Sequence, residues 1–270
     1  MSDAQNPAEP TTTTTAFYII SDPQVGHEVQ EERLLKKRDV LLKKATKDDV
    51  VLVPGDITQY GIGNVSNPFV RYLCMCVCIR RRKGESVDRY SDELPRFKRM
   101  FMNPVEKKIG NVLLCIGNHD SLTQWWTGCN PVYEYVKRRH GGLVYEKEVA
   151  GGILVFSLSE YPDARAVSWL KDRLNRQYAK DRPFVVFFHY NLEGPYSDWW
   201  KDSEKEAFYK AIEPHKDRLA FIAVGHVHWT KLSEWRGIRV VNGAGEGLIR
   251  LTVHRDGKNR LKGVDARYMT

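Results

Sequence analysis

Five short apolar runs divide the chain, and polar residues follow each of them directly. The runs cover residues 17–20, 50–53, 112–116, 184–188 and 219–224. Apolar runs of this length between loops are typical of β-strands buried on both faces, as in parallel sheets. Residues 28–47 instead place leucines and valines among charges, which predicts an amphipathic helix. The chain therefore opens with a β-α-β unit and predicts an α/β fold.

The remaining pattern completes this picture. We predict further helices at residues 133–139, 166–178 and 203–212, and further strands at 143–148, 152–158, 239–241, 247–253 and 260–264. Residues 61–110 begin with loop residues and then mix apolar and basic groups, which indicates a helical insertion. Residues 1–15 are polar, so we expect a flexible tail. No linker interrupts the rest, and we expect a single domain over residues 16–270.

The polar residues after the five runs are types that bind metals or move protons. In chain order they are Asp22, Gln24, Asp56, Asn118, His119, Asp120, His189, His226 and His228. In open α/β sheets, ligands bind at the carboxyl ends of the strands. We therefore expect these side chains to converge in one crevice, although they are spread over two hundred positions.

The donor atoms of this set are of mixed kind. The aspartates supply carboxylate oxygens, Gln24 and Asn118 supply amide oxygens, and the histidines supply imidazole nitrogens. This mixture suits Mn²⁺, Zn²⁺ or Fe, whereas a shell of oxygens alone would favour Ca²⁺ or Mg²⁺. Two ions about 3.5–4 Å apart need a carboxylate that reaches both, and Asp56 is the candidate. A glycine precedes Asp56, Asn118 and His226, where the backbone must approach the ions closely.

Composition narrows the classes of protein and partner. A hydrophobic content of 42% predicts a packed globule, and no run approaches the ~18 apolar residues of a membrane span. The net charge of +8 favours phosphorylated ligands, and nucleic acid is a weaker alternative. We interpret basic clusters such as residues 36–38 and 80–83 as solvated helix faces. Five cysteines, three of them at residues 74, 76 and 78, do not suit a disulfide framework and predict a reducing, cytoplasmic compartment.

Taken together, the motifs resemble those of the calcineurin-like metallophosphoesterase superfamily, over nearly the whole chain. The resemblance implies a four-layer αββα sandwich, in which two mixed β-sheets pack face to face between helices. It also implies a hydrolase with a binuclear metal centre, where a hydroxide that bridges the ions attacks phosphorus. By motif position, one ion would be held by Asp22, Gln24, Asp56 and His228, and the other by Asp56, Asn118, His189 and His226.

The same resemblance assigns roles to two further residues and exposes one departure. His119 would protonate the leaving group or steady the phosphate, and Asp120 would orient His119. The first motif of the superfamily is usually Asp-x-His, but this chain has Gln24 in place of the histidine. Because an amide oxygen is a weak donor, we expect this ion to be held loosely or to be a harder one, Mn²⁺ or Mg²⁺ over Zn²⁺. The Asp-Pro-Gln opening resembles small eukaryotic calcineurin-like phosphoesterase-domain proteins, some of which are Ser/Thr protein phosphatases.

These motifs favour a phosphomonoesterase that acts on a small molecule or a phosphoprotein. The Ser/Thr phosphatase family proper is not expected, because its substrate-gripping arginine has no counterpart after Gly55-Asp56. A phosphodiesterase or nuclease, prompted by the basic clusters, is one alternative. A binding scaffold of the same fold with a weakened site is another.

Several other residues invite either a functional or a structural interpretation. Trp125-Trp126 and Trp199-Trp200 would either flank the substrate or anchor loops, and Tyr190-Asn191 would either contact phosphate or support the backbone. We interpret Cys74, Cys76 and Cys78 as packing residues, since a structural zinc site needs four ligands. Surface or capping roles are expected for His27, His140, His215 and His254.

Overall fold

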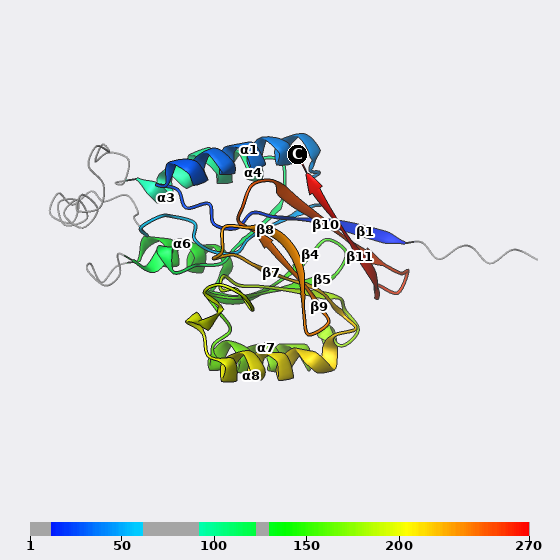
Figure 1. Ribbon diagram of the computed structural model, residues 1–270. Helices are drawn as coiled ribbons and strands as arrows, with labels where there is room; N and C mark the ends of the chain where they lie inside the picture. Colours follow the sequence, from blue (N-terminus) through cyan, green and yellow to red (C-terminus); the bar gives the residue numbers. More distant parts are fainter. Residues whose placement is uncertain (1–11, 62–91, 123–129, 270) are drawn as a thin grey trace, which may run out of the picture.

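Two mixed β-sheets lie face to face in the computed structural model, which describes residues 12–61, 92–122 and 130–269 (Figure 1). The first sheet has the strand order β11-β10-β1-β2-β3, and the second has the order β4-β5-β6-β7-β9-β8. The strands are β1 Thr13–Ile19, β2 Val50–Val53, β3 Asn111–Leu114, β4 Val144–Val149, β5 Ile153–Leu158, β6 Phe184–Phe187, β7 Leu219–Val224, β8 Thr230–Trp235, β9 Ile238–Gly243, β10 Leu248–Arg255 and β11 Leu261–Met269.

Helices cover the outer face of each sheet. Those against the first sheet are α1 Glu28–Lys44, α3 Glu93–Phe97, α4 Asn103–Glu106 and α6 Pro131–His140, and those against the second are α7 Ala164–Leu174 and α8 Asp202–Ile212. The result is the predicted four-layer sandwich of helices, sheet, sheet and helices (Figure 1). None of the helices in the described ranges is long and apolar enough to cross a membrane.

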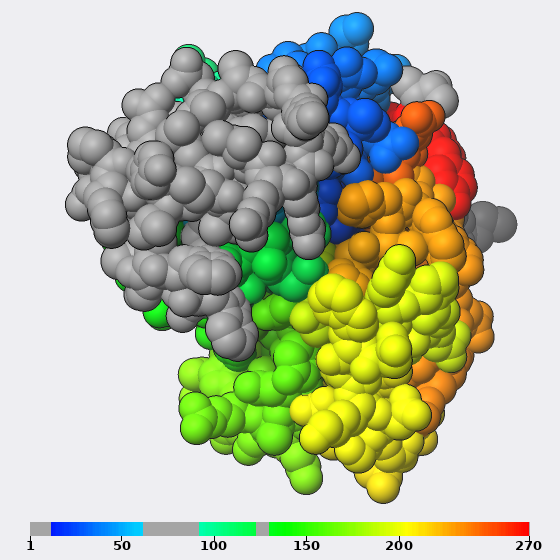
Figure 2. Space-filling model, turned by 60° about the vertical axis from the view of Figure 1, so that its left-hand side comes forward, coloured from blue at the N-terminus to red at the C-terminus, as the bar shows by residue number. Residues whose placement is uncertain are grey.

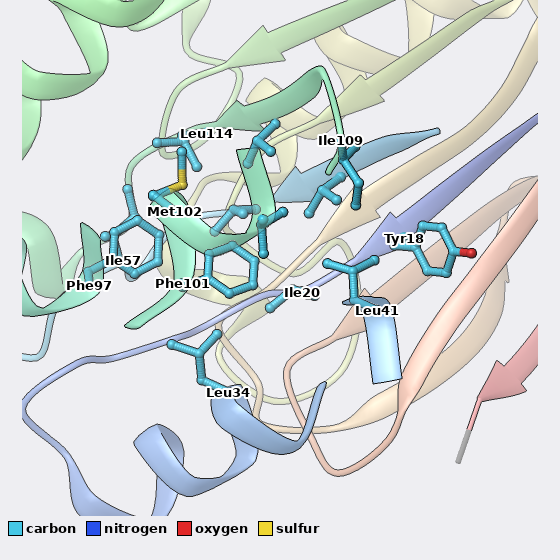
Figure 3. Close-up of a cluster of buried hydrophobic side chains, with 14 of the residues drawn as sticks. Tyr18, Ile20, Leu34, Leu41, Ile57, Phe97, Phe101, Met102, Ile109 and Leu114 are labelled. Atoms are coloured by element: carbon cyan, nitrogen blue, oxygen red, sulfur yellow. The ribbon is translucent and has the colours of Figure 1, made fainter. Parts of the chain in front are cut away.

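The core explains why the central strands read as unbroken apolar runs. Along β1, Phe17 and Ile19 point into the layer between the two sheets, while Tyr18 and Ile20 point toward the helices. Figure 3 shows Tyr18 and Ile20 from the sheet packing with residues of α1 and of the helical segment before β3. Between Ala16 and Ile20 both faces of the chain are therefore buried, and no position there favours a polar residue.

Parallel pairing brings the strand ends that carry the motifs together. In the first sheet β1, β2 and β3 run parallel, and in the second β5, β6, β7 and β9 run parallel. Antiparallel strands flank both parallel sets. The carboxyl ends of the parallel strands therefore lie at one edge of each sheet, as the sequence pattern predicts.

The structure corrects two sequence expectations and adds one strand. Thr13 to Thr15, placed in the flexible tail, are part of β1 because β10 pairs with them. Lys37, placed on a solvated face, is 4% exposed, and its ammonium donates to the carbonyl of Gly243 at 2.6 Å. Strand β8 was not predicted, because it is an edge strand whose residues are mostly polar and half of them exposed.

Part of the predicted insertion lies outside the described ranges. Residues 62–91 belong to this part, and they include Cys74, Cys76, Cys78 and the basic residues 80–83. The described remainder is helical, as predicted: α3 and α4 join through a π-helical turn at Lys98–Met102. Pro104 has no amide hydrogen to donate, which accounts for a wider turn just before it.

His140 caps an edge strand and makes stability depend on pH. Its Nε2 accepts the backbone N–H of Leu114 on edge strand β3 at 3.3 Å, and its ring stacks on Tyr145 at 4.4 Å. Burial lowers the pKa of His140 from 6.5 to about 3. Between pH 6.5 and pH 3, His140 is therefore protonated in the unfolded chain but neutral in the folded chain. Because protons favour the unfolded state, stability is lost as the pH falls from 6.5 toward 3.

We predict that His140→Gln flattens this acid dependence, because an amide oxygen still accepts the bond but does not titrate over this range. Urea unfolding at pH 7 and pH 5 should show wild type losing up to about 1.4 kcal/mol per pH unit more than the variant. Equal losses in both proteins would show that His140 does not cause the dependence. His254→Gln, a half-buried histidine paired with Asp265, is the matched control.

Candidate metal centre

The centre is built from residues that directly follow five parallel strands. Asp22 follows β1, Asp56 follows β2 and Asn118 follows β3 in the first sheet, while His189 follows β6 and His226 follows β7 in the second. Figure 2 shows blue, green, yellow and orange segments, far apart in the sequence, meeting near the middle of one face. The expected convergence is therefore present at the level of the elements.

Two carboxylates and one imidazole form the middle of the cluster. One ligand atom each from Asp22, Asp56 and His189 lie within 4.8 Å of one another, and all three residues are buried. His189 Nε2 lies 3.3 Å from Asp56 Oδ2, and its Nδ1 donates to the carbonyl of Pro54 at 2.9 Å. That bond fixes the ring so that Nε2 faces the carboxylates.

Asn118 joins this group to His226. Its Oδ1 accepts from His189 Nε2 at 2.9 Å and from His226 Nδ1 at 3.0 Å. Within the described part of the chain, the buried Nε2 of His226 has no hydrogen-bond partner. An imidazole nitrogen is a good ligand for the metals expected here, and Nδ1, which faces Asn118 Oδ1, is the His226 nitrogen that could share an ion with Asn118.

Gln24 and His228 complete the predicted set at its edge. Gln24 Nε2 donates to Asp56 Oδ2 at 3.2 Å, so that the amide lies against the expected bridging carboxylate. A half turn of the amide would put its oxygen donor there instead. His228 Nε2 lies 3.7 Å from Asp22 Oδ1, and its side chain is 40% exposed. All seven predicted ligands are thus linked through contacts to Asp22, Asp56 or Asn118.

The backbone around the ligands is unusual. Asp22, Gln24, Asp56 and His226 all have positive φ, between 37° and 69°. Such conformations cost about 1–3 kcal/mol for residues other than glycine and cluster at functional sites. A Cβ on Gly117 would overlap Asp56 Oδ1, and one on Gly225 would lie 2.5 Å from Asp22 Oδ2. The two carboxylates therefore lie in cradles that only glycine leaves open.

The charges explain why this cluster suits a cation. Burial raises the pKa of Asp22 to about 8, and the charge of Asp56 adds to the effect. Burial alone would raise the pKa of Asp56, but His189 holds it well below its usual range. Burial lowers the pKa of His189, yet Asp56 and Asp22 outweigh burial and raise it to about 10. A divalent cation could take over the positive charge that His189 carries here. The residues present therefore fit the implied metals.

His119 lies beside the cluster without belonging to it. Its backbone N–H donates to Asp56 Oδ1 at 2.9 Å, and its ring Nδ1 donates to the carbonyl of Gln59 at 2.9 Å. The backbone carbonyl can only accept, so Nδ1 keeps its proton and Nε2 is left as the atom that exchanges one. This arrangement suits a general acid.

The role expected for Asp120 needs correction. Its carboxylate accepts four hydrogen bonds, from the backbone N–H groups of Gly117, Ile57 and Thr58 and from the Thr58 hydroxyl. The group that orients the His119 ring is instead the Gln59 carbonyl. With its lone pairs taken up by these donors, Asp120 braces the loop that carries Asp56 against the loop that carries Asn118 and His119.

The aromatic residues beside the centre divide between two roles. Trp200 is 2% exposed, and its Nε1 donates to the carbonyl of Asn191 at 3.0 Å, so it anchors its loop. Trp199 is 49% exposed and its ring lies 4.5 Å from that of His226. Tyr190 is buried and donates its hydroxyl to Glu160 at 2.5 Å. Trp125 and Trp126 lie outside the described ranges.

Two residues of α1 that act on the centre, one by contact and one by charge, were not predicted. Gln30 is 3% exposed and its amide contacts His228 Nδ1 at 2.9 Å, while the charge of Lys37 acts on Asp22. Both lie on the helix face that also buries Leu34 and Leu41. A polar residue at a core-facing helical position is the signal that would have identified them.

We predict that Gln30→Leu weakens metal binding. Gln30 Nε2 lies 2.9 Å from His228 Nδ1, and a half turn of the amide puts its oxygen there instead, where it accepts the Nδ1 proton and fixes the ring with Nε2 free to bind a cation. Loss of such a partner lowers metal affinity by about 10–100-fold, and titration calorimetry with Mn²⁺ measures it. Gln30→Glu keeps an acceptor and should bind nearly as wild type does. Unchanged affinity in Gln30→Leu would show that Gln30 does not position His228.

Comparisons with known proteins agree with this geometry. Fold and site are of the metallophosphoesterase type, and a sequence model described as calcineurin-like phosphoesterase matches residues 15–230. The chain belongs to the calcineurin-like phosphoesterase family, and its activity class is that of the metallophosphoesterases. A comparison with curated protein sequences gave no significant match.

Solved structures support the fold. A dimetal phosphatase from Danio rerio has a TM-score of 0.55 and 11% identity, over 95% of this chain and 98% of that one. A putative 5'-nucleotidase from Staphylococcus aureus has a TM-score of 0.53 and 14% identity, over 95% of this chain but only 54% of that one. GAP50, the anchor in the inner membrane complex of Plasmodium, has a TM-score of 0.53 and 10% identity, over 95% and 89%.

Proposed function

We propose that this protein hydrolyses phosphomonoesters at a centre of two divalent metal ions. The observation that supports this most is the buried group of Asp22, Asp56 and His189, which Asn118 Oδ1 joins to His226 Nδ1. Two buried carboxyl groups at such short range need either a positive charge between them or a proton on one of them. The substrate is a phosphorylated small molecule or phosphoprotein.

The residues divide the work as their positions suggest. Asp22, Gln24, Asp56 and His228 would hold one ion, and Asp56, Asn118, His189 and His226 the other. Such ions polarise the phosphoryl group and make water more acidic, and Mn²⁺ is the first candidate, ahead of Fe, Zn²⁺ or Mg²⁺.

The chain's own contribution is to place groups around the phosphoryl. Water attacks phosphorus directly, and His119 gives a proton to the leaving-group oxygen from Nε2. The Gln59 carbonyl fixes the His119 ring for this transfer. The hydrogen bonds of Asp120 to both loops keep His119 and Asp56 at a fixed distance from each other.

Metal removal tests the proposal. We expect purified protein to hydrolyse 4-nitrophenyl phosphate, to lose the activity after dialysis against a chelator, and to recover it with Mn²⁺. Bis(4-nitrophenyl) phosphate, compared under the same conditions, distinguishes a monoesterase from a diesterase or nuclease. Activity that withstands chelation, with no metal left by elemental analysis, would end the proposal.

A binding scaffold is the second candidate function. Gln24, whose amide nitrogen faces Asp56, is the observation that favours it, and the similar GAP50 is described as an anchor. Calorimetry separates the two candidates, because a scaffold with a weakened site should bind no divalent ion.

The buried Cys115 is free and fits the reducing, cytoplasmic location that we propose.

A further inference from the structure

Two exposed aromatic side chains stand against a residue of the metal centre. Tyr196 is 57% exposed and Trp199 is 49% exposed, and their rings lie 5.6 Å and 4.5 Å from the ring of His226. Figure 2 shows the yellow and orange segments to which they and His226 belong lying side by side on the surface. Large apolar side chains exposed next to a polar centre are the kind of surface that binds a ligand.

The two rings form a corner. Tyr196 and Trp199 meet at 85° with their centroids 6.1 Å apart, and Tyr190 closes the inner end, at 86° to Trp199. Because about half of each side chain is exposed, a third ring can stack on the exposed part of one ring and meet the edge of the other. A bulky aliphatic group could fill the same corner but could not stack.

The loop holds this corner firmly. Tyr196 has φ of 58°, a left-handed conformation that is strained for a residue other than glycine. Trp200, packed on Phe188 and Phe208, ties the loop to the core directly after Trp199. Since Trp200 already anchors the loop, anchoring does not explain Trp199. A strained loop that presents aromatic rings to solvent needs another reason.

We propose that Tyr196 and Trp199 form a stacking subsite for a planar aromatic ring on the leaving group, and so select the substrate. The subsite lies beside His226, which places it next to a phosphoryl group held at the centre. The proposal rests on the proposed function and adds the class of leaving group to it. The ring could be an aryl group close to the phosphate or a nucleobase one sugar away.

Two matched pairs of substrates test the proposal and separate these sources. Benzyl phosphate has a planar ring near the phosphate, whereas cyclohexylmethyl phosphate has a puckered one. Adenosine 5'-monophosphate has a base further from the phosphate, whereas ribose 5-phosphate has none. We expect wild type to prefer the aromatic member of at least one pair by about tenfold in kcat/KM. The double variant Tyr196→Ala/Trp199→Ala should lose that preference, so that the ratio of its kcat/KM values for the two members of the pair approaches one.

Tyr268→Ala is the matched control, since Tyr268 is 56% exposed on β11 and should leave the preference intact. Calorimetry with benzylphosphonate and cyclohexylmethylphosphonate measures the same preference without turnover. Selective binding without hydrolysis of any substrate would refute the proposed function and leave the subsite standing. Hydrolysis with no aromatic preference in either pair, or a preference that the double variant keeps, would refute the subsite alone.

Discussion

Replacing Asp56 by Asn should lower kcat for 4-nitrophenyl phosphate on the order of 10³-fold, because metal ions supply several kcal/mol of transition-state stabilisation. Asp56 is the centre's most connected group: its oxygens accept from His119 N and Gln24 Nε2 and lie next to His189 Nε2. An amide keeps the shape but removes the charge that would hold both ions. Rates with saturating Mn²⁺ measure the effect.

The loss should reflect metal binding and not unfolding. Replacing Asp56 also removes the carboxylate that pairs with buried His189 and whose pKa His189 lowers, so the metal-free variant should melt lower than wild type, and rates are compared below its melting temperature. Mn²⁺ should raise the melting temperature of wild type by mass action and leave that of the variant unchanged. Asp172→Asn, an exposed carboxylate paired with Arg176, serves as the control. An Asp56→Asn variant with full activity would exclude Asp56 as a ligand.

The strands and the position of the site could be predicted from the sequence where burial on both faces requires apolar residues. The five apolar runs are strands buried on both faces, and the residues that follow them, such as Asp56 and His189, can only lie at one end of the sheets. The boundaries of α1 and α8 agree within three residues with those predicted, because apolar periodicity defines them. Polar residues that end a long apolar run abruptly, as the motif residues do, are therefore the site residues that can be predicted from the sequence.

What could not be read depends on contacts between distant segments. Strand β8 has mostly polar residues and forms by pairing with β9, so its own hydrophobic pattern does not predict a strand. The GNHD-type motif suggested that Asp120 serves its neighbour His119, yet its carboxylate reaches 62 and 63 positions back to Thr58 and Ile57. Gln30 likewise meets His228 from 198 positions away. Sequence motifs can identify such residues as candidates, but they do not predict which distant residues their side chains contact.

His119 gives the second large effect, and its size should depend on the leaving group. Removal of a general acid costs about 10²–10⁴-fold when the leaving oxygen needs a proton. We therefore expect His119→Ala to lower kcat/KM for benzyl phosphate by about this factor, and for 4-nitrophenyl phosphate, whose leaving group departs as a stable anion, by less than about tenfold. Parallel rate measurements on the two substrates provide the comparison.

This contrast separates proton donation from the other role considered for His119, steadying the phosphate. A residue that only binds the phosphoryl group contacts the same atoms in both substrates, so its loss would slow both equally. A residue that positions Asp56 through its backbone, as His119 N does at 2.9 Å, keeps that bond in the alanine variant. His254→Ala, distant in sequence from every motif, should change neither rate. Equal losses on both substrates would therefore assign His119 to phosphate binding and leave the general acid to be sought elsewhere.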